Sequence, residues 1–438
     1  MPSGLHFLVA AKQSEIAHLE QLAQTSALVS ASAQLVHSLQ RERGLSNLFL
    51  ASGDDQWATA LEKQTEDSVR SEARLRICLA EMVEADEPVL HRPRVLNRIA
   101  LALQGLDALP FLRQDVSRKG LKPAGATVAF IRLVDALLSM VFEAADASAE
   151  PDISNCLVAM FNLMQGKELA GQERAAGAAL FASGKADRNQ QEHLIHLIES
   201  QERNFTVFLN FADEAVLNVW ARSASLAVMP QELQRLRKAL LESADGGPLS
   251  TDCSQRWFDA CTDRIEAMKL VEDALASELK ILCEKRIQIS KNELARFELV
   301  AKAPLASPAA QEQAARHFFA QTSASTATLP ANRISSDPEA GASAGGTELE
   351  KSILDMVRDQ ARQLQTMNEE LEAARASLNE RKVIERAKGL LMAHRRLTED
   401  EAHKTMRQMA MNQNRRLIDV ANAVLAMADV LPTPAPSR

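Results

Sequence analysis

Apolar residues recur at helical spacing through most of this chain, and that pattern restricts the fold more than any other feature. In residues 13–291, Leu28, Ala31, Leu35 and Leu39 illustrate it, because spacings of three and four place side chains on one face of a helix. Short breaks divide the pattern into segments that allow helices of roughly 15 to 40 residues, the lengths found in helical bundles. The breaks fall at Pro88, Pro110, Pro123, Pro151, Pro230 and Gly246-Gly247-Pro248.

The amino-acid composition also favours helices over strands. The 438 residues include no Tyr and only 4% aromatic residues, although 46% are hydrophobic. Such a chain suits helices and suits a β-sandwich poorly, and it is long enough for two or three domains. We therefore expect an all-α fold, with two helical bundles in residues 13–300, a coiled-coil connector and a small three-helix C-terminal domain.

A weak internal repeat supports the expectation of two bundles. The segment QRERGLSNLFLASG, which starts at Gln40, aligns with GQERAAGAALFASG, which starts at Gly171. Both contain a Glu-Arg pair, a face of small residues and a final Gly. Repeats of this kind indicate related structural units, although a few identities in an Ala-rich chain can arise by chance.

Arg43 and Arg174 occupy equivalent positions in the two repeat segments, just before apolar runs. We expect their side chains to start near a bundle interior, where an arginine must be paired. One interpretation is a structural ion pair with Glu42, with Glu173 or with another helix. The other is an anion site, because a guanidinium offers a planar fork of donors that suits a planar oxyanion such as nitrate. The small residues beside the two arginines leave room for one: Gly44, Ser46, Ala175 and Gly177.

Residues 379–431 predict three short helices. Thr398 and Glu401 form a capping box that starts the second helix, the third starts near Leu417, and Pro432 ends it. The apolar positions of the first helix are Val383, Ile384, Ala387, Leu390 and Leu391; those of the second are Ala402, Met406 and Met409 or Ala410; those of the third are Ile418, Ala421, Val424 and Leu425.

This C-terminal module is basic, whereas the rest of the chain is acidic. Residues 379–429 contain ten Lys or Arg and seven Asp or Glu, a net charge of +3, while the whole chain carries −8. A basic module on an acidic protein favours a polyanionic partner such as nucleic acid, but a solvated helical face would look similar. Gly389 lies mid-helix, where Gly is unfavourable. It indicates either tight packing against the third helix or the close approach of a nucleic-acid backbone.

Two segments connect these parts. Residues 301–347 are rich in Ala, Ser, Thr, Pro and Gly, which predicts a flexible linker. In residues 348–378 apolar residues alternate at spacings of three and four, which predicts a coiled coil that leads into the first C-terminal helix. A helix folded against its own chain is the alternative. A parallel homodimer would place two basic modules side by side.

The first part of the chain resembles the NIT domain, the nitrate- and nitrite-sensing module, over about residues 30–285. The resemblance rests on the two repeat segments, on the motifs that start at Gln201, Arg235 and Trp257, and on Arg264-Ile265-Glu266. It implies two packed four-helix bundles that bind the anion between helices through arginines. On the family motif, Arg43 and Arg174 are ligand residues; Arg237 is the choice for the second-half arginine, with Arg235 as the alternative and Arg264 as a structural residue.

The C-terminal module resembles the ANTAR RNA-binding domain. The run IERAKGLLM, which starts at Ile384, carries the signature, and Glu401-Ala402, Met406-Arg407, Ala410-Met411 and residues 419–421 continue it. The resemblance implies binding to paired RNA hairpins in mRNA leaders, which prevents a transcription terminator from forming. The signature residues are Lys388, Gly389, Met392, Arg407 and Met411. On electrostatic grounds we add Arg386, Arg395, Arg415 and Arg416.

Together the two resemblances predict a cytoplasmic, nitrate- or nitrite-responsive transcription antiterminator of the NasR type, in which anion binding controls RNA binding for a nitrate or nitrite assimilation operon. The alternative is a helical interaction protein whose basic module docks an acidic protein partner. We expect no enzyme activity, because the sequence has no Gly-rich phosphate loop, no HExxH motif and no GxSxG nucleophile elbow; the GASAG run at residues 341–345 lies in the predicted linker. Nor do we expect a cofactor, a metal site, a DNA target or a membrane span.

Four questions stay open at this point. The sequence does not distinguish nitrate from nitrite, and it does not name the target operon. It also leaves undecided whether the ligand triggers dimerisation or unmasks a preformed dimer, and which second-half arginine completes the site.

Overall fold

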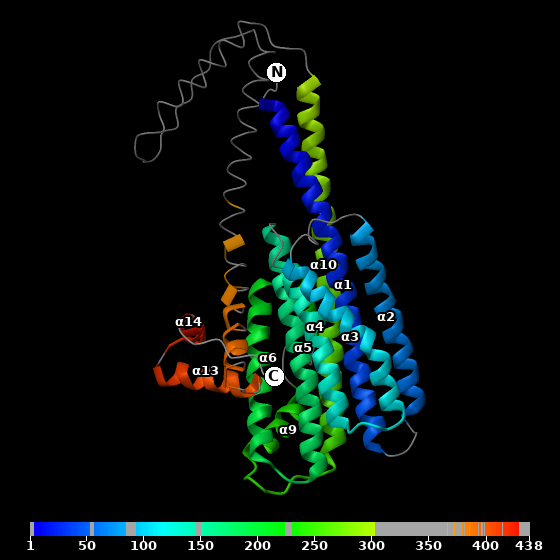
Figure 1. Ribbon diagram of the computed structural model, residues 1–438, viewed down its shortest axis with the longest axis vertical. Coiled ribbons are helices and arrows are strands. Elements are labelled where there is room, and N and C mark those ends of the chain that lie inside the picture. Colours follow the sequence, from blue (N-terminus) through cyan, green and yellow to red (C-terminus); the bar gives the residue numbers. More distant parts are fainter. Residues whose placement is uncertain are drawn as a thin grey trace, which may run out of the picture. The chain divides into compact units, whose positions relative to one another are not determined.

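The computed structural model describes residues 4–52, 57–84, 93–145, 150–223, 230–302 and most of 379–428, with a few isolated positions between 366 and 376. These residues are almost entirely helical, which confirms the all-α prediction (Figure 1). The helices are α1 (Gly4–Ser52), α2 (Ala58–Glu84), α3 (Pro93–Ser117), α4 (Pro123–Ala145), α5 (Pro151–Ser183), α6 (Arg188–Phe211), α7 (Glu214–Arg222), α9 (Gln231–Glu242), α10 (Cys253–Lys302), α13 (Glu399–Gln413) and α14 (Leu417–Ala428).

Most helix ends follow the local sequence signals. Helices α3, α4 and α5 begin at a proline. Proline has no backbone N–H, but an N–H in the first turn would have no partner within the helix, so nothing is lost there. Asp187 and Asp213 cap α6 and α7 by accepting hydrogen bonds from backbone N–H groups. Gly184 ends α5 in the left-handed conformation, with φ of 69°. The predicted Gly stop of the second repeat segment is therefore confirmed.

Two expectations about the helices were wrong. Pro110 does not break the pattern but lies inside α3, whose buried face continues from Leu106 and Leu109 to Val116. Burial of that apolar face offsets the cost of an internal proline, about 3 kcal/mol. Helices α1 and α10 contain 49 and 50 residues, longer than the predicted upper length.

The chain divides into two compact units. The smaller contains residues 1–20 and 283–369. Within it, Lys12 on α1 bonds Glu15 on the same helix and Glu293 on α10, each at 2.6 Å. Lys12 is buried, and these hydrogen bonds outweigh the desolvation that would lower its pKa, so the pKa is raised. The predicted linker and coiled coil, 301–347 and 348–378, lie almost wholly outside the described residues.

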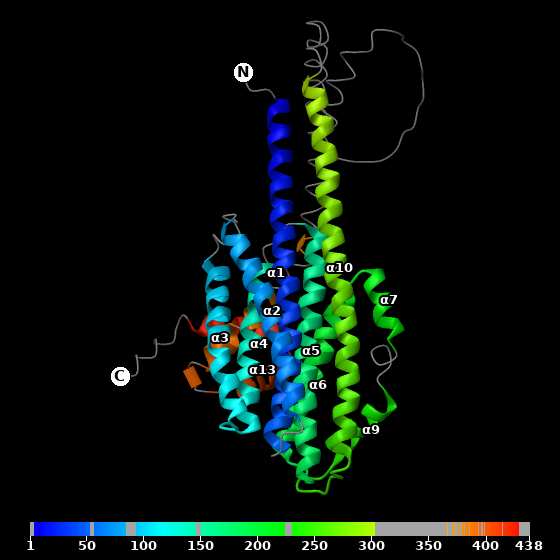
Figure 2. The same cartoon turned by 90° about the vertical axis from the view of Figure 1, so that its right-hand side faces the viewer.

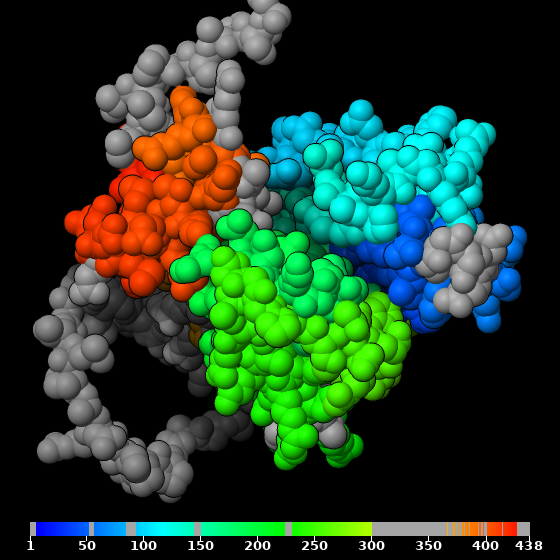
Figure 3. All heavy atoms as spheres, turned by 90° about the horizontal axis from the view of Figure 1, so that it is seen from below, coloured from blue at the N-terminus to red at the C-terminus, as the bar shows by residue number. Residues whose placement is uncertain are grey.

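Two helical bundles, as predicted, make up most of the larger unit, which contains residues 21–282 and 370–438. In the first, Phe49 of α1, Val116 of α3 and Ala126 of α4 form a core with residues at the start of α2. In the second, helices α5, α6, α9 and α10 bury Trp257 and Phe181 at their centre, and α9 packs against α10 at one end (Figure 2). The first bundle, blue to cyan, and the second, green, form adjoining lobes in Figure 3.

The C-terminal module has the predicted core. Ala387 and Leu391 pack with Ala402, Met406 and Ala410 of α13 and with Val420, Ala421 and Val424 of α14. Gly389 does not fit our packing interpretation, because a Cβ built on it would meet no atom of the described residues within 4 Å. Close packing against the third helix therefore does not explain this glycine.

Residues 93–117 and 123–143, in α3 and α4, are each long and apolar enough to cross a membrane by length and composition. Length and composition alone are weak evidence for a membrane span, so the expectation of none stays a prediction. In the structure α4 packs against both α3 and α5. The core helices of a bundle need the same length and composition.

Gly177 on α5 leaves space for the indole of Trp257 on α10. A Cβ on this residue would lie 2.2 Å from the indole of Trp257, which is fully buried. We predict that Gly177→Ala lowers the free energy of unfolding by about 1–3 kcal/mol, because the indole must move. Chemical denaturation measures this loss. Gly125→Ala is the control, since its Cβ would make only an ordinary contact at 3.9 Å; equal losses in both variants would contradict the prediction.

Candidate functional site

Each bundle contains a buried Glu that holds an arginine through two hydrogen bonds. Glu42 on α1 accepts from Arg113 on α3, at 2.7 and 3.0 Å. Glu173 on α5 accepts from Arg237 on α9, at 2.7 Å for both bonds. Glu42 and Glu173 are equivalent in the internal repeat, so the same kind of Glu–Arg pair links two helices within each bundle. Sequence reasoning missed Arg113, and the repeat itself was the signal that could have found it.

Arg43, the next residue on α1, faces the other bundle. Its guanidinium is 3% exposed and donates to both oxygens of Glu168 on α5, at 2.5 and 3.2 Å. Gln40 donates to the same carboxylate at 2.8 Å. The structural interpretation of Arg43, an ion pair with another helix, therefore holds in this conformation.

Arg174 on α5 is also buried, with 9% exposure, but its contacts differ. It donates to Thr262 of α10 at 2.9 Å and lies 4.7 Å from the ring centre of Phe258. Among the described residues it forms no ion pair with a carboxylate. Burial, and then the nearby charge of Arg43, lowers the pKa of Arg174 from 12.5 to about 10.

The two arginines lie next to each other, each over the glycine of the other helix. A Cβ on Gly44 would lie 3.1 Å from Nη2 of Arg174, and a Cβ on Gly171 would lie 2.8 Å from Nη2 of Arg43. The predicted small residue at position 44 thus makes room for a guanidinium. Two like charges that meet in a buried interface favour a bound anion.

The second-half arginines lie differently from this pair. Arg237 is buried, but its Nε and one Nη are bound to Glu173, and Arg235 is exposed on α9. Arg264 lies 3.9 Å from Glu173 and donates to Gln201 at 3.0 Å.

Buried charge continues beyond the arginines, in a cluster that sequence reasoning did not identify. Lys167 of α5, which is fully buried, bonds Glu272 of α10 at 2.5 Å, and Lys269 bonds the same carboxylate at 2.9 Å. Burial lowers the pKa of Lys167. These ion pairs connect α5 and α10 within the second bundle.

The C-terminal module exposes most of the residues predicted to bind RNA. Lys388 is the exception, since it is 9% exposed, and Arg407 is half-buried. The exposed residues are Arg386, Gly389, Met392, Arg395, Met411, Arg415 and Arg416.

Helix α13 of this module contacts α6 of the second bundle. Arg407 binds both oxygens of Glu199, at 2.5 and 3.0 Å, and Lys404 binds Glu192 at 2.6 Å. Between these pairs the rings of His196 and His403 lie 4.5 Å apart. A residue of the predicted RNA-binding signature, Arg407, is therefore bound to a carboxylate of the helical bundle.

Comparisons with known proteins identify the families of the two regions. A family model for nitrate and nitrite sensing, NIT, matches residues 34–280, and the ANTAR domain model matches residues 372–425. The nitrate regulatory protein of Klebsiella oxytoca is 29% identical over 426 residues, which cover 97% of this chain and 96% of that protein. A solved structure, described as that of the NasR transcription antiterminator, has a TM-score of 0.58 and 27% identity and covers 98% of this chain and 100% of that chain.

The NIT match includes both repeat segments, both Glu–Arg pairs and the arginines between the bundles, and it spans more than half of the chain. The protein therefore belongs to the NIT family of nitrate- and nitrite-sensing proteins, with an ANTAR domain following the sensor.

Proposed function

We propose that this protein is a transcription antitermination regulator in which nitrate or nitrite, bound at Arg43 and Arg174, controls RNA binding by the ANTAR domain. The observation that carries the proposal is Arg174, a buried guanidinium that has no carboxylate partner among the described residues and faces a second arginine. A small anion would supply the counter-charge. The K. oxytoca relative is a nitrate regulatory protein and the similar solved structure is a transcription antiterminator, and both support the same conclusion.

The arrangement suits a planar monovalent oxyanion. The guanidinium of Arg174 already uses one nitrogen on Thr262, so its remaining donors can face a ligand. Arg43 would then share its charge between the ligand and Glu168. Arg237 could take part only by giving up some of its pairing with Glu173, and Arg235 only by moving from its exposed position.

Helix α6 connects the two sites. Gln201 on α6 donates to Glu173 at 2.7 Å, and Glu173 precedes Arg174 on α5. Glu199, which holds Arg407, lies two residues before Gln201. We propose that anion binding shifts α5 and α6 relative to each other and releases α13. The ligand must then favour the released form by a few kcal/mol.

The freed module would bind paired hairpins in a leader mRNA, in the cytoplasm and as a homodimer. Its exposed arginines would contact phosphates, and Gly389 would allow the RNA backbone to come close. The competing hypothesis, a module that docks an acidic protein partner, is not favoured by the family matches. The function needs neither a cofactor nor DNA.

Arg174→Met should abolish nitrate binding without harming the fold. A buried charge without an ionic partner is replaced by an apolar side chain, so the unliganded protein should be equally stable or more stable, by about 1 kcal/mol or more. Wild-type protein should gain about 2.7 kcal/mol at nitrate about 100-fold above Kd. Thermal unfolding with and without nitrate measures both effects.

Arg43→Met should change the stability of the unliganded protein in the opposite direction to Arg174→Met. It leaves the buried carboxylate of Glu168 without its ion pair and should lower stability by about 3–5 kcal/mol. Full nitrate stabilisation of the Arg174→Met protein would contradict the proposed site.

Glu199→Gln should make RNA binding independent of nitrate, because Arg407 loses its charged partner on α6. The measurement is a gel shift of a paired-hairpin leader RNA with and without nitrate. Glu202→Gln is a matched control, since it removes the same charge from an exposed position three residues away on α6. RNA binding by the Glu199→Gln protein that still requires nitrate would contradict release of α13 as the switch.

Gly389→Ala should separate stability from RNA binding. The new methyl group meets no protein atom within 4 Å, and Ala is favoured over Gly in helices by about 1 kcal/mol. We therefore expect a slightly more stable module that binds hairpin RNA more weakly. A combined fluorescence-anisotropy and denaturation experiment tests this, and undiminished RNA affinity would remove Gly389 from the interface.

A further inference from the structure

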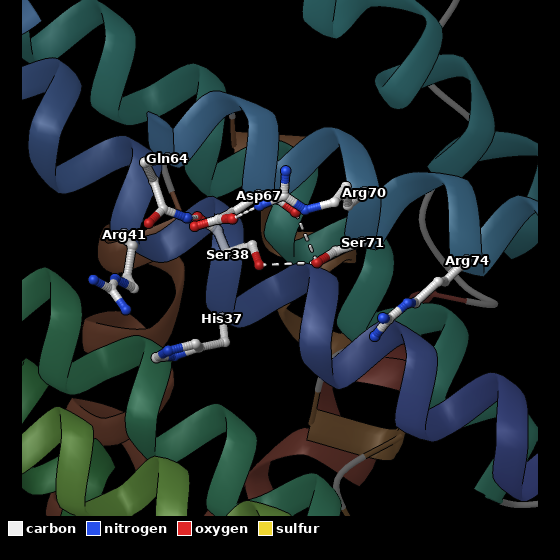
Figure 4. Close-up of a pocket in the computed structure, with 8 residues that line it drawn as sticks. All are labelled: His37, Ser38, Arg41, Gln64, Asp67, Arg70, Ser71 and Arg74. Atoms are coloured by element: carbon white, nitrogen blue, oxygen red, sulfur yellow. Dashed lines mark hydrogen bonds and ion pairs between the residues drawn. The ribbon is translucent and has the colours of Figure 1, made fainter. Parts of the chain in front are cut away.

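A pocket of about 220 Å³ lies between α1 and α2, in the first bundle, and is lined by basic and polar side chains (Figure 4). It contains neither Arg43 nor Arg174, which lie between α1 and α5. The residues that line it from α1 are at positions 37, 38 and 41, and those from α2 at 64, 67, 70, 71 and 74. Its donors are the guanidinium groups of Arg41, Arg70 and Arg74, the hydroxyl groups of Ser38 and Ser71, and the amide of Gln64.

The charge of the pocket is positive. Its one carboxylate, Asp67, pairs with Arg70 one turn along α2, and Glu66 lies 4.0 Å from the same guanidinium. Arg41 and Arg74 form no ion pair with any residue that the structure describes, and both are exposed. Arg41 and Arg74 therefore bring positive charge to the pocket from two different helices, and they lie at opposite ends of its lining in Figure 4.

His37 provides an independent sign of a ligand. This side chain lines the pocket, is only 8% exposed, and its Nδ1 has no hydrogen-bond partner among the residues that the structure describes. Burial, and then the charges of Lys167, Lys269, Arg41 and Arg174, lowers its pKa to about 2, so the ring is neutral at physiological pH. A buried polar atom without a partner is unfavourable, and a ligand group in the pocket could bond it.

We propose that this pocket binds a phosphorylated small molecule with at least two negative charges. Its volume exceeds what a single planar anion needs. Guanidinium, hydroxyl and amide donors approach from two helices, an arrangement that suits the several oxygens of tetrahedral phosphoryl groups better than the two oxygens of one carboxylate. Arg41 and Arg74 neutralise the charge. Ser71 donates to the backbone oxygen of Asp67 and lies 3.1 Å from the Ser38 hydroxyl, so Ser38 is the hydroxyl that can turn to donate to a phosphoryl oxygen. The sensor therefore has a second input besides nitrate.

The test is calorimetric titration of the full-length protein with inorganic phosphate, pyrophosphate, ADP and citrate. We expect pyrophosphate or ADP to bind more tightly than citrate. Tighter binding of ADP than of pyrophosphate would identify the ligand as a nucleotide. Arg41→Gln and Arg74→Gln should each weaken binding about tenfold or more, because each removes a charge-assisted contact. Arg98→Gln, which removes the same charge from an exposed site on α3, should have no effect. Thermal unfolding of each variant checks that the fold is retained.

Nitrate distinguishes this pocket from the site at Arg43 and Arg174. Arg74→Gln should leave the nitrate response unchanged, and Arg174→Met should leave pyrophosphate binding unchanged. The proposal fails if pyrophosphate and ADP do not bind, if neither pocket variant weakens them, if citrate binds as tightly, or if nitrate displaces them competitively. In the last case the groove would belong to the nitrate site.

Discussion

The buried charge of Arg174 is the physical constraint on which the proposed anion site depends. A guanidinium removed from water is stable only with a counter-charge or a full set of hydrogen-bond acceptors. Arg43 has Glu168, but Arg174 has a hydroxyl group and an aromatic face. Its charge is tolerated because the rest of α5 is deeply buried and fixes its place. An anion from solution would supply the counter-charge. The unpaired charge of Arg174 would then explain both the affinity for the ligand and the lower stability of the interface without it.

The Glu–Arg pairs explain how the repeat produces this interface. Consecutive residues on an α-helix point about 100° apart. Glu42 and Glu173 therefore face their own bundles, where Arg113 and Arg237 hold them, while Arg43 binds Glu168 of the opposite bundle. Arg174 keeps Thr262 and Phe258 of its own bundle as partners and places one guanidinium nitrogen beside Gly44 of α1. Gly44 and Gly171 then let the two guanidinium groups cross the interface. The duplicated motif thus places one arginine from each half at the contact between the halves.

Sequence periodicity predicted the helices, the repeat and the burial of Arg43 and Arg174, because these depend on residues near in sequence. It did not predict which carboxylates pair with which arginines. Glu168 and Arg43 are 125 residues apart, and their pairing depends on the register of α1 against α5. Pro110 was misread for a similar reason, since tertiary packing of α3 outweighs a local breaking signal. Gly389 shows the reverse: only the structure excludes a packing role.

The contact between α13 and α6 shows how a weak interaction can control RNA binding. Arg407 uses two donors on Glu199, and the same donors would be needed for a phosphate. The two partners therefore exclude each other at this side chain, even though most of the basic residues of the module stay exposed. Partly exposed ion pairs are individually weak. A modest preference of the nitrate-bound sensor for a different α5–α6 arrangement is then enough to release α13, whereas a large apolar interface would hold the module regardless of ligand.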